Sequence, residues 1–527
     1  MSINATKPRH DLAPASPDDW TKLTEKDAFK ALENVKGQLF INNEWVDPKA
    51  GGKLDVVDPR TGDVVKKIAS AEPEDVDAAV KAARKAFDEG PWPRMGGKAR
   101  GRLLSKLADL MEAHLHELSL LESLDAGKPL SQSVLKEIPL AIDNWRYFAG
   151  WADKITGKVL PTDTPHHAYT LIEPLGVVAA ITPWNFPLME FTWKVTPALA
   201  AGNTVVIKVS KETALTALLM GDLAKQAGLP PGVLNILTGP GTSLGDAMTE
   251  HPLVDKVTFT GSTSVGRGVG EKAGSGLKAY TLELGGKSPV VVCPDVDIDK
   301  AVEVATMGLL YNMGQCCAAG TRLYVHADIY DAFVAKYCKA LQSCGDPFKP
   351  DTQHGPQINE RQLKKIQQYV EEGKKDKSCK LLCGGERVGD KGYYFQPTAF
   401  EVFDNNAKIA QEEIFGPVQC VFKWSKMDEV VAAANDNPYG LAAGVLAKDQ
   451  AMIDALVRRI KAGTVWVNTY NVYDAGVPFG GYKDSGVGRE KSEYVLQSYT
   501  QVKAVYQPWR ILRPGTESSY PSHHVQP

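Results

Sequence analysis

Three segments of this sequence carry the groups needed for covalent chemistry at a carbonyl carbon. Cys317 lies in Gly-Gln-Cys-Cys-Ala-Ala-Gly, residues 314–320, where small neighbours let a small electrophile reach the thiol. Glu283 opens Glu-Leu-Gly-Gly-Lys and can activate a water molecule. Asn185, in Pro-Trp-Asn-Phe-Pro, offers an amide that can donate a hydrogen bond to an oxyanion. These residue types predict a nucleophile, a general base and an oxyanion donor.

Each of these residues also has a purely structural interpretation. A small thiol is often a buried core cysteine, a carboxylate beside a turn can be solvated, and an asparagine before a helix can cap it. The glycines and alanines around Cys317 favour close approach of a ligand, and Cys316 is expected to be its neighbour rather than the nucleophile. Burial between Leu282 and Leu284 would raise the pKa of Glu283 toward the range of a general base.

Two further segments favour a bound dinucleotide. Residues 261–266, Gly-Ser-Thr-Ser-Val-Gly, follow an apolar strand and open a helix, which suits a pyrophosphate at the helix N-terminus. The motif lacks the complete spacing of the dinucleotide fingerprint, so it is a weak signal by itself. Glu413 precedes Ile-Phe-Gly-Pro, where its carboxylate could accept two ribose hydroxyls or could belong to an ordinary loop.

Composition restricts the class of protein. With 527 residues the chain is too long for one core, so we expect two or three domains. The net charge of -3 and the lack of a basic stripe argue against nucleic acid or an anionic membrane as partner. No apolar run approaches the ~18 residues of a membrane span. Eight irregularly spaced cysteines suit a reducing compartment, and we expect no metal site, although Cys379 and Cys383 have ligand-like spacing.

The two ends of the chain are expected to lie outside the folded domains. Residues 1–36 are polar and contain five aspartate or glutamate residues between 11 and 27, which secretory and mitochondrial signals avoid, so a cytoplasmic location is expected. A short helix is expected near 25–34. Residues 510–527 are rich in Ser, Pro and His and are expected to form a mobile tail.

The elements that must position these residues are most regular in the middle of the chain. Apolar strands alternate with helices there, which predicts a doubly wound parallel sheet. Ligands bind outside the carboxyl ends of such strands, where Asn185, Lys208 and Gly261 lie. The predicted strands are 177–182, 204–208, 233–237 and 257–260, and the predicted helices are 188–201, 213–227, 243–249 and 264–273.

Other segments extend this pattern on both sides. Residues 38–58 predict a β-hairpin, and helices are expected over 74–88 and 98–126. A second alternating α/β region covers 284–484, with strands at 288–292, 322–326 and 465–468 and helices at 299–311, 328–343 and 427–435. Residues 166–173 and 498–507 alternate like strands and could pair into an arm that another subunit extends.

Taken together, these segments resemble the aldehyde dehydrogenase superfamily over residues 38–509. The similarity is greatest to the large tetrameric class of plant and animal enzymes, as residues 87–94, 146–153 and 478–486 indicate. The resemblance implies a Rossmann-like cofactor domain at 37–155 and 174–282 and an α/β catalytic domain at 283–484. It also implies a β oligomerisation arm at 156–173 and 490–509, and hence a homo-oligomer, either dimer or tetramer.

The resemblance implies roles for individual residues. Cys317 would be the nucleophile, Glu283 the base, and Asn185 with the backbone N–H of Cys317 the oxyanion hole. Lys208 would contact the adenosine ribose and Glu413 the nicotinamide ribose of NAD. The remaining cofactor positions would be Trp184, Gly241, Gly245, Gly261, Ser262 and Phe415. Phe186, Trp193, Tyr473 and Phe479 would line the tunnel for the aldehyde.

Two positions depart from the family pattern. Lys211 replaces a ribose-binding glutamate, so NADP is expected to be used beside NAD. Glu190, and Glu137 as a further candidate, replace apolar tunnel residues. We expect Glu190, one turn past Asn185, to place negative charge near the tunnel mouth and to favour cationic or hydroxylated aldehydes.

Two other functions are compatible with such a fold. A CoA-acylating relative would transfer the acyl group to CoA and would lack the water-activating carboxylate, so Glu283 argues against it. A structural or binding protein on the same fold would tolerate loss of Cys317 or Glu283, and both are present. The sequence therefore predicts oxidation of an aldehyde to a carboxylic acid.

Overall fold

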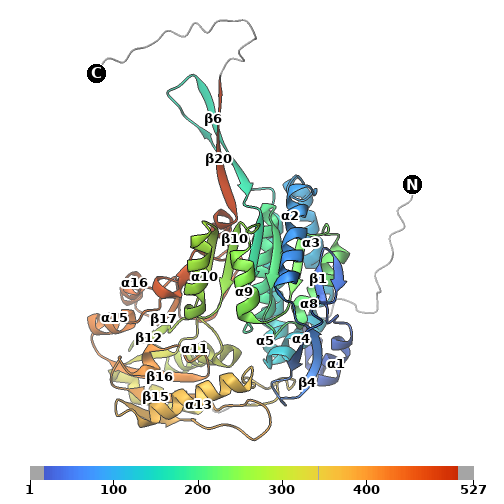
Figure 1. The fold of residues 1–527 in the computed structure, drawn as a ribbon. Coiled ribbons are helices and arrows are strands. Elements are labelled where there is room, and N and C mark those ends of the chain that lie inside the picture. Colours follow the sequence, from blue (N-terminus) through green and yellow to red (C-terminus); the bar gives the residue numbers. More distant parts are fainter. Residues whose placement is uncertain (1–16, 342–343, 509–527) are drawn as a thin grey trace, which may run out of the picture.

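The computed structural model describes residues 17–341 and 344–508. Figure 1 shows a broad α/β body from which a narrow arm of strands projects. The described residues form an eight-stranded sheet, a seven-stranded sheet, a three-stranded arm and a separate pair of strands. The predicted α/β fold class is confirmed.

The eight-stranded sheet has the order β19-β11-β10-β7-β8-β9-β1-β2. Its centre, from β11 to β9, is parallel, and β19, β1 and β2 are antiparallel additions at the edges. In sheet order the strands span Gly486–Val487, Ala279–Glu283, Lys256–Thr260, Val177–Ile181, Thr204–Lys208, Leu234–Leu237, Leu39–Ile41 and Glu44–Val46.

Helices cover both faces of this sheet, which explains why its central strands are apolar at successive positions. In β7, Val177 and Ala179 belong to a core shared with α2, α9 and α10, whereas Val178 and Ala180 belong to a core shared with α3, α7 and α8. The helices of this region are α1 (Glu25–Glu33), α2 (Pro73–Asp88), α3 (Gly97–Ala113), α4 (Leu115–Ala126), α5 (Leu130–Gln132), α6 (Ile138–Trp151), α7 (Pro187–Ala201), α8 (Leu215–Ala227), α9 (Gly241–Glu250) and α10 (Thr263–Ser275).

The seven-stranded sheet has the order β14-β15-β16-β13-β12-β17-β18 and is parallel except at its β14 edge. In sheet order the strands span Cys379–Cys383, Thr398–Val402, Val418–Trp424, Arg322–His326, Pro289–Val292, Ala442–Leu446 and Thr464–Val467. Its helices are α11 (Ile298–Leu310), α12 (Tyr330–Ala340), α13 (Glu360–Lys375), α14 (Lys408–Gln411), α15 (Met427–Asn435) and α16 (Gln450–Arg459). The first two pack on one face and the other four on the opposite face.

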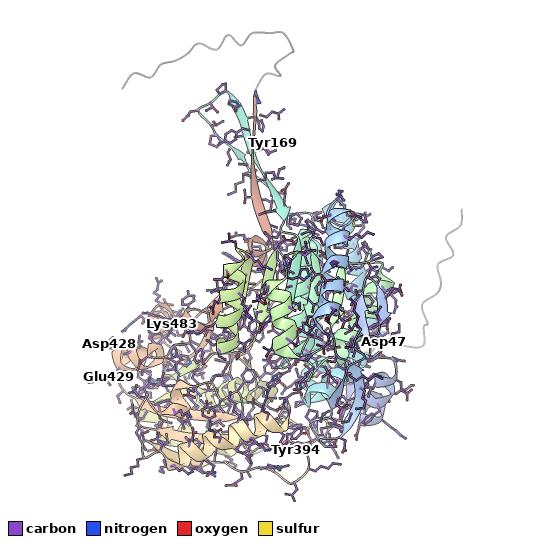
Figure 2. All side chains as sticks on the ribbon, in the orientation of Figure 1. Asp47, Tyr169, Tyr394, Asp428, Glu429 and Lys483 are labelled. Carbon is purple, nitrogen blue, oxygen red and sulfur yellow. The ribbon has the colours of Figure 1, made fainter. Side chains whose placement is uncertain are left out.

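The arm is an antiparallel sheet of β20 (Thr500–Pro508), β6 (His166–Pro174) and β5 (Val159–Leu160). It projects away from the body, and Figure 2 places Tyr169 along it, far from the other labelled side chains. The two predicted strands therefore do pair with each other, in register from Thr500 opposite Pro174 to Pro508 opposite His166.

Several predicted elements differ in their limits. The predicted helix 98–126 is two helices, because His114 takes φ −103° and ψ 18° between α3 and α4. The predicted hairpin 38–58 is two pairings: β1 with β2, and β3 (Lys53–Val57) with β4 (Val64–Ala69). The predicted helix 328–343 is helical over α12. Its last two residues lie outside the described residues, as do residues 1–16 and the predicted tail 510–527.

Short helices complete the described chain. They are Pro17–Lys22, Ser133–Glu137, Tyr311–Gly314, Ala327–Ile329, Lys483–Ser485 and Glu493–Ser498. Within residues 17–341 and 344–508, none of the helices has the length and apolar character required to cross a membrane.

Candidate active site

Cys317 follows a segment with an unusual backbone. Asn312 and Met313 have φ of 50° and 57°, and Gly314 has φ of 73°. A Cβ atom on Gly314 would lie 2.4 Å from the Gly416 backbone, so glycine is required for this close approach. The turn carries Cys317 to the carboxyl edge of the eight-stranded sheet, close to the last residue of β11, Glu283.

The thiol of Cys317 faces the carboxylate of Glu283 beside a pocket. Cys317 Sγ lies 4.0 Å from Glu283 Oε2, with the thiol as donor. Asn185 and Cys317 both line this pocket, whose volume is about 170 Å³. The three residues that sequence motifs predicted as nucleophile, base and oxyanion donor are therefore close together.

Buried charges determine the protonation of Glu283. Burial, followed by the nearby carboxylates of Glu190 and Glu490, raises the pKa of Glu283 well above its usual value, and Lys194 opposes this shift. Glu283 Oε1 has no hydrogen-bond partner among the described residues. A raised pKa suits a group that must accept a proton and later release it. The pKa of the Cys317 thiol is also raised, by its hydrogen bond with Cys316, by burial and by Glu283.

Lys194 joins two of these carboxylates. It lies one turn after Glu190 on α7, with Nζ 3.9 Å from Glu190 Oε2, and it donates a hydrogen bond to Glu490 Oε1. All three side chains are buried. Burial, then Glu490, raises the pKa of Glu190 to about 7. Because a lysine and three carboxyl groups share this interior, a protonation change at one alters the others.

The position of Glu190 contradicts its expected place at the tunnel mouth. Every residue of α7 is buried, so one turn past Asn185 the helix directs this side chain into the interior, where it meets Lys194. Glu137 is also buried and accepts a hydrogen bond from Lys128 Nζ at 2.5 Å. Both carboxyl groups are paired with buried lysines, so neither presents a negative charge at the surface.

The backbone of Asn185 is held by two buried donors. Its carbonyl oxygen accepts hydrogen bonds from Lys128 Nζ at 3.0 Å and from Asn312 Nδ2 at 2.6 Å. Lys128 Nζ also lies 3.6 Å from Glu122 Oε1, whose carboxylate accepts from the backbone N–H of Leu188 at the start of α7. These contacts fix the peptide that carries the Asn185 amide.

The same pocket includes five of the predicted cofactor positions. Trp184, Gly261, Ser262, Glu413 and Phe415 line it together with Cys317. The rings of Trp184 and Phe415 meet edge to face at 5.2 Å between centroids.

Hydrogen bonds hold Glu413 and Phe415 in place. Glu413 Oε1 accepts from Gly286 N at 3.0 Å, and Gln362 Nε2 donates to the Phe415 carbonyl at 2.7 Å. A carboxylate, small residues at a helix start and two aromatic rings beside the thiol fit a nicotinamide nucleotide.

The other predicted cofactor residues lie along the same sheet edge. Lys208 is the last residue of β8 and pairs in register with Ile181 and Leu237 of its neighbours. Gly241 and Gly245 belong to the first turns of α9. Burial, then the charge of Lys211, lowers the pKa of Lys208 to about 8. Lys211 itself is 52% exposed and 3.8 Å from Glu212 Oε1.

The predicted tunnel residues form two aromatic groups. Trp193 lies 6.0 Å from Tyr473 and 5.5 Å from Phe479 between ring centroids, and Lys491 Nζ lies 5.0 Å from the Trp193 ring. Phe186 stacks on Tyr311 at 5.5 Å. The aromatic walls are thus assembled from α7, from the turn before Cys317 and from the chain after β18.

Sequence reasoning missed the residues that support this site. Lys128, Lys194, Asn312 and Glu490 contact the predicted residues from distant parts of the chain. Their only sequence signal was a charged or amide residue within an apolar stretch, as for Lys194 in α7. Within the described chain, no cluster of three or more His, Cys, Asp or Glu residues is arranged to hold a metal ion.

Known proteins resemble this chain over most of its length. The Aldehyde dehydrogenase family profile matches residues 45–505. Aldehyde dehydrogenase family 2 member B4, mitochondrial, of Arabidopsis thaliana is 52% identical over 471 residues, which are 89% of this chain and 87% of the relative. Benzaldehyde dehydrogenase, mitochondrial, of Antirrhinum majus is 50% identical over 89% of this chain and 88% of its own length.

A solved structure agrees with the fold. The NAD+ complex of aldehyde dehydrogenase from Bacillus cereus superposes with a TM-score of 0.89 at 42% identity, covering 91% of this chain and 98% of that one. The chain belongs to the aldehyde dehydrogenase family. It is an enzyme that oxidises an aldehyde to a carboxylic acid with NAD as cofactor.

Proposed function

We propose that Cys317 is the nucleophile, that Asn185 and the backbone N–H of Cys317 form the oxyanion hole, and that Glu283 is the general base. The thiol points to Glu283, so this carboxylate can accept its proton as the sulfur attacks the aldehyde carbon. The oxyanion that forms is stabilised by the two donors. NAD, held by residues that line the pocket with Cys317, would supply the acceptor for the hydride that this carbon loses. Glu283 passes the thiol proton to solvent and then takes a proton from the water that attacks the thioester. The C–S bond breaks, which releases the carboxylic acid and restores the sulfur of Cys317.

One observation carries this proposal. Cys317, which lines a pocket with Asn185 and five of the predicted cofactor residues, has its Sγ 4.0 Å from Glu283 Oε2. Trp184, Gly261, Ser262, Glu413 and Phe415 would hold NAD there, and Lys208, Gly241 and Gly245 would hold its adenosine half. Lys211 would attract the 2′-phosphate of NADP, which we propose as a second, weaker cofactor.

Rapid mixing of the Glu283→Gln variant with NAD and an aldehyde tests the role of the base. An amide can take a proton neither from the thiol nor from water, so NADH should form more slowly than in the parent, reach about one equivalent and then stall. Glu250→Gln, a surface carboxylate on α9, is the control and should turn over like the parent. Unimpaired steady-state turnover of Glu283→Gln would contradict the proposal. Turnover of the parent enzyme that requires CoA would favour the acyl-transferring alternative.

We further propose that the favoured aldehydes are uncharged and aromatic. Trp193, Tyr473 and Phe479 supply apolar walls, and the buried Glu190 no longer supports a preference for cations. A charged aldehyde would lose hydration among these rings, so kcat/KM should fall roughly tenfold or more. A comparison of benzaldehyde, betaine aldehyde and succinic semialdehyde with both nucleotides tests this. Equal kcat/KM values for the three would contradict it.

Assembly and location are further proposals. We propose a dimer or tetramer joined through the arm, because Val159, Val502 and Tyr506 are 73%, 68% and 67% exposed there. We propose domain limits at 37–155 with 174–282 for cofactor binding and 283–484 for catalysis. A cytoplasmic location is proposed from the eight free cysteines, which suit a reducing compartment. Two relatives are named mitochondrial, so cell fractionation is the deciding test.

A further inference from the structure

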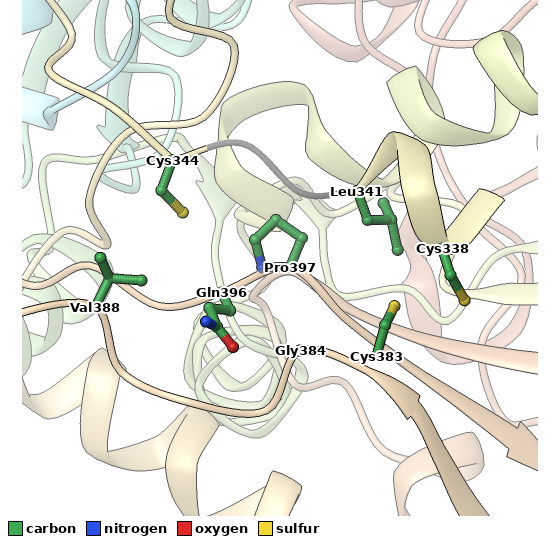
Figure 3. A pocket seen from close by; sticks show the side chains of 8 residues that line it. All are labelled: Cys338, Leu341, Cys344, Cys383, Gly384, Val388, Gln396 and Pro397. Carbon is green, nitrogen blue, oxygen red and sulfur yellow. The ribbon is translucent and has the colours of Figure 1, made fainter. Parts of the chain in front are cut away.

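Two thiols lie close together outside the active site. Cys338 is on α12 and Cys383 is the last residue of β14, and both line the same pocket. Both are partly exposed. They line one end of a pocket of about 460 Å³, where Figure 3 shows their sulfur atoms beside each other.

The other cysteines outside the active site do not combine a neighbouring thiol with access to a pocket. Cys344 lines the same pocket but lies at its other end, beyond Pro397, and its thiol donates to the Phe395 carbonyl at 3.5 Å. Cys293 and Cys420 are buried. Burial, the largest effect on Cys379, raises the pKa of that thiol to about 11.

We propose that Cys338 and Cys383 are a dithiol site for hydroperoxides, which closes into a disulfide that joins α12 to β14. The site is separate from the aldehyde pocket and does not depend on the proposed roles of Cys317 or Glu283. Its pocket has room for hydrogen peroxide and for small organic hydroperoxides.

The two thiols have different parts in this reaction. The neighbouring Cys338 thiol lowers the pKa of Cys383, whereas the Cys383 thiol and burial raise the pKa of Cys338. The Cys383 thiolate therefore attacks the peroxide and becomes a sulfenic acid, as the O–O bond breaks and hydroxide leaves. Cys338 sulfur then attacks the sulfenic sulfur and forms the S–S bond. The departing hydroxide takes the Cys338 proton, so two thiols and one peroxide give one disulfide and two waters.

The backbone around Cys383 can adjust to the new bond. β14 is the edge strand of the seven-stranded sheet, and its pairing with β15 shifts register between Leu381 and Cys383. An edge strand with an irregular register can move without breaking a second ladder. A disulfide formed here would close the loop between α12 and β14 and stabilise that edge.

Treatment of the intact enzyme with hydrogen peroxide, followed by peptide mass spectrometry, tests the site. We expect a peptide pair joined through Cys338 and Cys383 that is lighter by two hydrogen atoms and is restored by a dithiol reductant. The crosslink should be absent from Cys338→Ser and Cys383→Ser. It should persist in Cys344→Ser, the matched control in the same pocket. The crosslinked enzyme should also show a higher thermal midpoint than Cys338→Ser treated alike.

A sulfenic-acid reagent separates the two parts of the reaction. In Cys338→Ser, the reagent dimedone should label Cys383 after peroxide treatment, because no neighbouring thiol removes the sulfenic acid. In Cys383→Ser, Cys338 should remain unlabelled. Absence of both crosslink and label at peroxide levels that inactivate Cys317 would overturn the proposal, as would a crosslink formed mainly with Cys344.

Discussion

Cys317 follows a second cysteine, Cys316, in the sequence. Separate substitutions of the two residues can therefore test which thiol is the nucleophile. Cys316 is buried, whereas Cys317 reaches the pocket. Cys317→Ala should lower aldehyde oxidation on the order of 10⁴-fold or more, because no other group supplies the covalent step. Cys316→Ala should keep most of the rate. Steady-state assays of both variants check this, and an active Cys317→Ala would rule out covalent catalysis by this residue.

The buried carboxylate of Glu190 is expected to influence the pH at which Glu283 acts as the proposed base, because it raises the pKa of Glu283. Glu283 must be deprotonated to activate water, and its raised pKa means that the rate falls as pH drops through that value. Glu190→Gln removes a nearby negative charge, so the pKa of Glu283 should decrease and the acidic limb of kcat should move to lower pH. The control Glu250→Gln changes an exposed carboxylate on α9. A pH profile unchanged by Glu190→Gln would show that the two carboxyl groups are not coupled.

Lys211 is the departure from the family pattern on which the proposed use of NADP depends. The Lys211 side chain is half exposed, and its Nζ lies 3.8 Å from Glu212 Oε1, which is a long, weak contact at the surface. The ammonium can therefore turn toward a 2′-phosphate. Lys211→Glu should lower the ratio of kcat/KM with NADP to kcat/KM with NAD by roughly fivefold. This factor corresponds to the free energy of about 1 kcal/mol that a partly exposed charge contributes. Lys225→Glu, exposed on α8, is the matched control. An unchanged ratio would exclude Lys211 from cofactor choice.

At the scale of elements, the start of α7 depends on a neighbouring helix and a turn. Lys128 follows α4 and Asn312 lies in the turn before Cys317, and both donate to the carbonyl oxygen of Asn185. Asn312→Gly should preserve the left-handed backbone while deleting one donor. We expect kcat to fall roughly tenfold with KM little changed, since a displaced oxyanion donor weakens the transition state rather than binding.

A double-mutant cycle distinguishes positioning from general damage. If Asn312 acts through Asn185, Asn312→Gly should cause no further loss of kcat in the Asn185→Ala background. Lys128→Met should behave in the same way in variants that retain the parent's thermal midpoint. Additive losses in the two backgrounds would mean that these donors act on the reaction by another route.

At the scale of the whole molecule, the arm exposes apolar side chains that the body cannot cover. The strands β20, β6 and β5 form a sheet with few neighbours of their own, and a small isolated sheet is marginal in water. Deleting residues 500–527 should therefore give monomers or insoluble protein. Deleting 509–527 alone is the control and should leave the assembly intact. Light scattering that finds the same oligomer after both deletions would contradict a role for the arm in assembly.

Local patterns in the sequence were sufficient to predict the class of fold and several residues of the candidate site. Continuous apolar strands such as Val177–Ile181 predicted a sheet covered on both faces, because both sides of each strand must be buried. Since parallel strands end at one edge, the same pattern predicted that Asn185, Lys208 and Gly261 lie along that edge. The break at His114 and the limits of the hairpin depended on packing and were not predicted.

Contacts between distant segments were decided only by the tertiary structure. Lys194 and Glu490 are 296 residues apart in the sequence, yet they meet beneath Glu283, and no local pattern encodes such a contact. Glu190 makes a second contact that the sequence did not predict. Its spacing from Asn185 determined its place on the helix but not which residues would surround it. Periodicity determines which residues are buried, whereas the packing of elements determines which buried charges become partners. For this reason the sequence predicted the candidate reacting groups, and the fold determined their protonation and support.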